Sequence, residues 1–137
     1  MAAQQQIFWP MGALALLTFA ALLQVPFRRF RAARQGVVGA KDFAYGESSA
    51  VPGEVSIPNR NYMNLLEAPV LFYVVCLMAF VSGRVGVVVL GLAWTYVALR
   101  AVHSAIHLTY NNVFHRLIAF TASNVVLALL WIAFFAL

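Results

Sequence analysis

The polar residues best suited to chemistry in this sequence are embedded in apolar stretches, where they recur at helical spacing. Arg60, Asn64 and Glu67 are separated by four and three positions, which places them on one face of an α-helix. If a second such helix lies beside the first, their polar faces meet across a shared crevice. The chain contains that second set, again at spacings of three and four: Tyr96, Arg100, His103, His107 and Asn111.

The side chains of this predicted crevice are mainly cationic. A charged side chain within a bilayer is costly, so it faces the bundle interior, a partner or a wet cavity. One interpretation is an ion pair between Glu67 and Arg100 that fixes the register of the two helices without any ligand. The surplus of Arg and His over a single Glu favours a second interpretation, in which an anionic ligand binds in the crevice.

Two other chemistries are disfavoured by the neighbouring residues. His103 and His107 have the spacing of a metal-binding pair, but the sequence has no H-E-x-x-H motif, and Arg100 and Arg116 would repel a cation. No metal site is therefore predicted. The single cysteine, Cys76, lies in an apolar run, which excludes a disulfide scaffold and disfavours a nucleophilic thiolate.

The composition indicates which elements must position these residues. Of the 137 residues, 64% are hydrophobic and 9% are charged, with a mean hydropathy of +0.85. A soluble domain has about 45–50% apolar and about 25% charged residues, so a soluble or disordered protein is excluded. We predict an all-α integral membrane four-helix bundle, a single domain over 1–137 with spans at about 7–27, 62–82, 85–108 and 117–137 and a cytoplasmic loop at 28–60.

The distribution of basic residues predicts the orientation of this bundle. Seven basic residues fall at the end that contains the 28–60 loop and Arg116, whereas the opposite end has only Arg84. The positive-inside rule therefore places the loop in the cytoplasm and both termini outside. Orientation and attraction to anionic membrane lipids account for the pI near 10.0, so no nucleic-acid partner is predicted.

Two motifs resemble those of a known family. The stretch from Arg60 to Phe72, in which Arg, Asn and Glu precede Pro69, resembles the second-helix signature of the MAPEG family, the membrane-associated proteins in eicosanoid and glutathione metabolism. The stretch from Arg100 to His107, followed by Arg116, is similar to the third helix and the start of the fourth in prostaglandin E synthase-like and microsomal glutathione transferase-like members. The resemblance covers essentially the whole chain and is that of a bacterial-type member.

The resemblance implies a homotrimer that binds glutathione, as a co-substrate, between neighbouring subunits at the cytoplasmic side of a bacterial inner membrane. Asn64 and Glu67 would hold the α-amino group of glutathione, and Arg116 would be the catalytic residue that stabilises its thiolate. The other implied glutathione-binding residues are Arg28 from the adjacent subunit, Arg60, Arg100, His103 and His107, the last at a position where many relatives have tyrosine.

The implied activity is of the glutathione transferase or peroxidase type, on a lipophilic small molecule that enters from the bilayer. An eicosanoid substrate is not supported, because Leu117 stands where the prostaglandin synthase branch has serine. The alternative is a MAPEG-like membrane scaffold or lipid-binding protein that keeps the polar crevice without catalysis. Conjugation of glutathione to a generic electrophile distinguishes the two.

Overall fold

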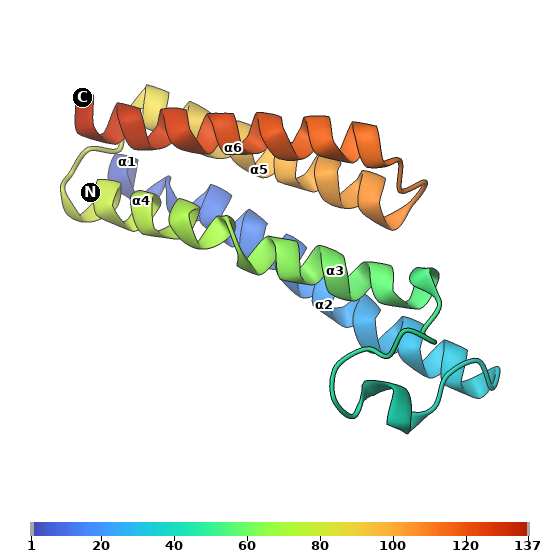
Figure 1. The fold of residues 1–137 in the computed structure, drawn as a ribbon. Coiled ribbons are helices and arrows are strands. Elements are labelled where there is room, and N and C mark those ends of the chain that lie inside the picture. The colour runs from blue at the N-terminus through green and yellow to red at the C-terminus, as the bar shows by residue number, and fades with distance from the viewer. Residues whose placement is uncertain (1, 137) are drawn as a thin grey trace.

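Helices make up most of the computed structural model, which describes residues 2–136 (Figure 1). Four helical segments are long and apolar enough to cross a membrane, so the predicted all-helical architecture with four spans is confirmed. In chain order the elements are α1 (Ala2–Gln5), α2 (Phe8–Arg34), the 3-10 helix η1 (Ala40–Phe43), α3 (Gly53–Leu66), α4 (Pro69–Val81), α5 (Val87–Leu108) and α6 (Val113–Ala136).

The helices are longer at one end of the bundle than the predicted spans. α2 continues past residue 27 to Arg34, α3 begins at Gly53 instead of residue 62, and α6 begins at Val113 instead of 117. The connection between α2 and α3 is therefore only 35–52, shorter than the predicted loop. The predicted spans end where the apolar runs end. Arg and Ala also favour helix, so the helices extend beyond the apolar runs. The predicted end of the fourth span, Leu137, lies outside the described residues.

The second membrane segment consists of two helices, although the sequence predicts one helix over 62–82. Pro69 has no N–H to donate to the carbonyl group four residues earlier, and its ring clashes with that group, so α3 cannot continue through it. Glu67 leaves helical geometry, with φ −82° and ψ −96°, and α4 begins again at Pro69. The break leaves the last carbonyl groups of α3 without partners inside the helix.

The helices pack in pairs around an apolar core. α5 lies antiparallel to α6, and α2 lies along α3 (Figure 1). In the core between the pairs, the rings of Phe72 and Tyr96 stack with their centroids 4.8 Å apart. Many large apolar side chains, such as Leu16, Phe19 and Leu23 on α2, point outward, which suits a surface that faces lipid. The α5–α6 turn and the 35–52 loop lie at the same end of the bundle (Figure 1).

Candidate functional site

A small cavity with a mixed polar and apolar lining lies between α3, α5 and α6, near the end of the bundle that carries the α5–α6 turn. Its volume is about 240 Å³. Three residues predicted from the sequence to belong to one site, on three different helices, line this cavity together. The complete lining is Asn64, His103, Val113, Arg116, Leu117 and Phe120.

Arg100 is buried beside this cavity and joins α5 to the broken end of α3. Its side chain is fully inaccessible to solvent, and its Nη2 donates a hydrogen bond to the main-chain carbonyl of Asn64. That carbonyl belongs to the last turn of α3, where the break at Pro69 leaves acceptors free, and a cation is favourable at a helix C-terminus. The guanidinium also lies 5.8 Å from the ring centroid of Phe120 on α6. Arg100 thus connects three helices.

The ion pair between Glu67 and Arg100, one of the two interpretations of the sequence, is not formed in this chain. Within residues 2–136 the one salt bridge joins Arg29 Nη2 to Glu47 Oε1, at 2.7 Å. Glu67 is exposed at the break between α3 and α4, and Arg100 bonds a carbonyl group instead. The interpretation in which the two residues neutralise each other within the bundle is therefore wrong for the single chain.

Two buried histidines follow Arg100 on the inner face of α5. The rings of His103 and His107 are 5.9 Å apart between centroids and nearly perpendicular, and His103 also contacts the Phe120 ring at 5.8 Å. Several buried polar atoms here lack a hydrogen-bond partner among the described residues, although such groups are normally paired. They are Nε and Nη1 of Arg100, Nδ1 of His103, Nδ1 of His107, Oγ of Ser104 and the hydroxyl of Tyr96.

Arg116 lies in the first turns of α6 and is held by the α5–α6 turn. Its Nη1 donates a hydrogen bond of 2.8 Å to Oδ1 of Asn111. Asn111 has a φ of +46°, in the left-handed region, where Asn is tolerated better than most residues. The next residue, Asn112, caps α6, since its Oδ1 accepts hydrogen bonds from the main-chain N–H groups of Phe114 and His115, both at 3.0 Å.

Other predicted site residues lie outside the cavity of the single chain. Arg60 and Glu67 are exposed, and the Nδ2 group of Asn64 donates to the carbonyl of Arg60 at 3.0 Å. Arg28, on α2, donates from Nη1 to the carbonyl of Glu54 at 3.4 Å. The structure therefore brings together Asn64, Arg100, His103, His107 and Arg116. It leaves the half-buried Arg28 and the exposed Arg60 and Glu67 outside the cavity.

Two residues near the site have roles that the sequence prediction did not include. The spacing predicts Asn111 on the polar face of the third span, but its contact with Arg116 depends on the α5–α6 turn. Asn61 is fully buried, with both side-chain amide atoms unpartnered. Its spacing of three from Pro58 and four from Leu65, both buried, is the signal that places it on the inner face of α3.

Four helices long and apolar enough to cross a membrane, with the buried cation Arg100 beside a cavity lined in part by His103 and Arg116, define an integral membrane protein with a polar site among its helices. The sequence profile of the MAPEG family matches residues 7–136. The chain therefore belongs to the MAPEG family, whose membrane proteins include glutathione-dependent enzymes. Comparison with curated proteins and with solved structures gave no match.

Proposed function

We propose that this chain is a membrane-embedded glutathione-binding enzyme of the transferase or peroxidase type that acts on lipophilic electrophiles. The observation that carries the proposal is the cavity lined by Asn64, His103 and Arg116, with the buried cation Arg100 beside it. Membership of a family that includes glutathione-dependent enzymes supports the choice of ligand. The site would face the cytoplasm of a bacterial inner membrane.

The donors around the cavity fit an anionic peptide with a thiol. His103 lines the cavity and would bind a carboxylate or a main-chain carbonyl of glutathione, and the buried Arg100 beside it would add positive charge that favours the anion. Asn64, with Glu67 nearby in sequence, would hold the α-amino group. Arg116 lines the mouth of the cavity, where its guanidinium would favour the thiolate form of the sulfur.

The remaining predicted glutathione-binding residues lie outside the cavity, which favours a site shared between subunits of a homotrimer. Glu67 and Arg60 are both exposed within the second membrane segment, where an unpartnered charge that faces lipid is unfavourable. A neighbouring subunit would cover both, and its Arg28 would complete the site. Native mass spectrometry in mild detergent tests the trimer, and a monomer or dimer under those conditions would contradict it.

The chemistry of conjugation requires little from the protein beyond charge stabilisation. The thiol proton leaves to solvent, the thiolate attacks the electrophilic carbon, and a carbon–sulfur bond forms as the leaving group departs with its electron pair. A cation beside the sulfur raises the thiolate fraction at neutral pH and acts where charge is concentrated. Arg116 is the residue of this chain placed to supply it.

The proposal is tested with Arg116→Leu, assayed with glutathione and an aryl halide. The expected result is a lower rate at neutral pH and a thiolate titration, followed by ultraviolet absorbance of bound glutathione, that moves to higher pH, with little change in binding. Arg31→Leu is the matched control, because Arg31 is an exposed arginine of α2 outside the cavity. Identical thiolate titrations in the wild type, Arg116→Leu and Arg31→Leu would refute the catalytic role of Arg116 and favour a non-catalytic membrane scaffold.

A further inference from the structure

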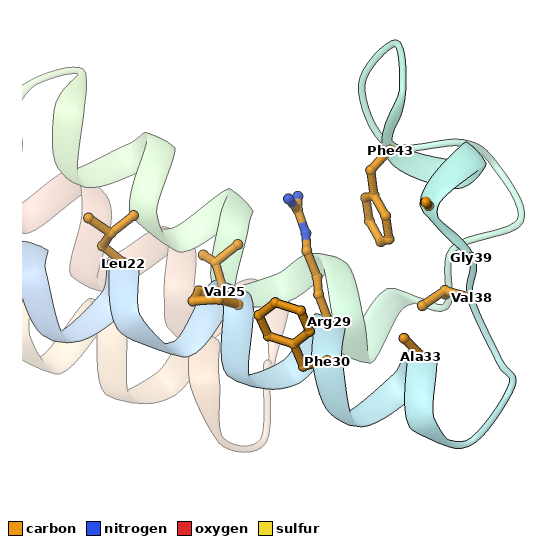
Figure 2. Close-up of a pocket in the computed structure, with 10 residues that line it drawn as sticks. Leu22, Val25, Arg29, Phe30, Ala33, Val38, Gly39 and Phe43 are labelled. Carbon is orange, nitrogen blue, oxygen red and sulfur yellow. The ribbon is translucent and has the colours of Figure 1, made fainter.

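A second, apolar groove lies on the outer side of α2, away from the cavity between α3, α5 and α6, and shares none of its lining residues with that cavity. Its volume is about 450 Å³, within the range of about 300–1,000 Å³ typical of small-molecule sites. Figure 2 shows α2 along one side of the groove and the loop that carries η1 across its end. The lining is Leu22, Val25, Pro26, Arg29, Phe30, Ala33, Val38, Gly39, Ala40 and Phe43.

The groove extends from the membrane into the aqueous end of the bundle. Leu22 belongs to the apolar part of α2, whereas Ala33 lies in its arginine-rich end. At 1.5 Å per residue these two positions are about 16 Å apart along the helix. The length, the volume and the apolar lining of the groove suit one flexible apolar chain.

The loop side of the groove is held in place by its own contacts. The guanidinium of Arg29 lies 4.4 Å from the centroid of the Phe43 ring and bonds Glu47 at 2.7 Å, so that the ring faces α2 (Figure 2). Asp42 accepts hydrogen bonds from the Gly39 N–H at 2.8 Å and from the Ser48 hydroxyl at 2.9 Å. The groove is thus formed before any ligand enters it.

Two cations are next in sequence to residues that line the aqueous end of the groove, and one of them, Arg34, lines an adjoining hollow that shares Phe30 with it. Arg34 follows the lining residue Ala33, and Lys41 follows the lining residue Ala40. Both are exposed, and neither has a carboxylate partner within the described part of the chain, whereas the charge of Arg29 is already paired with Glu47. An apolar groove with exposed cations beside its aqueous end is complementary to a molecule with an apolar chain and an anionic headgroup.

We propose that this groove is a binding site for an anionic phospholipid, with one acyl chain along α2 and the phosphate between Arg34 and Lys41. The site differs from general attraction to the membrane surface, because the apolar groove fixes where the lipid lies. It shares no lining residue with the cavity proposed for glutathione, although Arg28 of the proposed glutathione site also lies on α2. A bound lipid would fasten the 35–52 loop to α2.

The proposal is tested by native mass spectrometry of the full chain, with phosphatidylglycerol and phosphatidylcholine of identical acyl chains added in turn. Ala33→Phe fills the groove, and Ala20→Phe is its control, an exposed alanine on the opposite side of α2. The double variant Arg34→Gln/Lys41→Gln removes the proposed headgroup contacts. Its control is Arg84→Gln, which removes one exposed charge from the turn between α4 and α5, at the opposite end of the bundle.

The wild type is expected to retain one phosphatidylglycerol per chain in preference to phosphatidylcholine. Ala33→Phe should abolish this retention. The double variant should reduce it about 25-fold, since each cation near an anionic headgroup contributes about fivefold, the factor equivalent to about 1 kcal/mol. Equal retention of the two lipids by the wild type, or an equal loss in the controls, would overturn the proposal. A change of oligomeric state in Ala33→Phe without loss of lipid would show instead that a second copy occupies the groove.

Discussion

The hydrogen bond from Arg116 to Asn111 can be removed to test whether it positions the Arg116 guanidinium for catalysis or only stabilises the fold. We expect Asn111→Gly to release the guanidinium of Arg116 while the turn is kept. Glycine adopts the φ of +46° that Asn111 has, without a steric penalty, so the backbone conformation survives the substitution. Alanine at the same position would add about 1–2 kcal/mol of strain and would confuse the two effects.

The magnitude follows from the geometry of the contact. A hydrogen bond to a charged group contributes about 1.5–3 kcal/mol, and the 2.8 Å contact is only partly buried, so the lower end applies. A loss of about 1.5 kcal/mol at the transition state corresponds to a rate about tenfold lower. The expected result is therefore a tenfold lower kcat for conjugation of glutathione to an aryl halide, with its Kd little changed.

The neighbouring residue supplies the control. Asn112→Ala removes the N-cap of α6 and should lower stability by about 1 kcal/mol, measured as a lower Tm in detergent, without touching Arg116. Its kcat should remain that of the wild type. An unchanged kcat in Asn111→Gly, or an equal fall of kcat in Asn112→Ala, would refute the positioning role.

Three further predictions concern the broken helix and the loop. Glu67→Gln should weaken glutathione binding by roughly tenfold or more and Glu67→Asp less, because only Asp keeps a carboxylate for the α-amino group; calorimetry on folded variants decides. Pro69→Ala should let α3 continue into α4, so that a main-chain N–H of the helix replaces Arg100 as the partner of the Asn64 carbonyl. The expected results are slower hydrogen exchange at 67–70 and weaker glutathione binding. Asp42→Asn should speed hydrogen exchange in the 35–52 loop. Hydrogen bonds from Gly39 and Ser48 lower the pKa of Asp42 below its ordinary 3.8. The stability that the ionised Asp42 gives the loop is therefore fully present above that pH and is lost as the pH falls through the lowered pKa.

Much of the candidate site could be predicted from the sequence, because the polar residues lie on helices whose periodicity fixes their faces. The spacing of Arg100, His103 and His107 placed all three on the inner face of α5, and the structure buries all three. The position of Arg116 just after a short turn placed it at the same end. These residues are close together because two adjacent antiparallel helices can meet in few ways.

The sequence by itself determined the class of the protein. Four long apolar runs with so few charges belong in a bilayer, and there their main-chain N–H and C=O groups must pair with one another, as they do in helices. The sequence could not determine which partner each buried polar group has. Pro69 can be seen in the sequence, and it predicts a helix break that frees the Asn64 carbonyl. The partner of that carbonyl depends on α5 lying beside α3. Only in the packed structure does Arg100 bond this carbonyl and not the carboxylate of Glu67. The contact between Asn111 and Arg116, and the groove closed by Phe43, likewise depend on how a turn and a loop fold back. Helix periodicity is a local property, whereas the choice between competing hydrogen-bond acceptors is made only when the helices have packed.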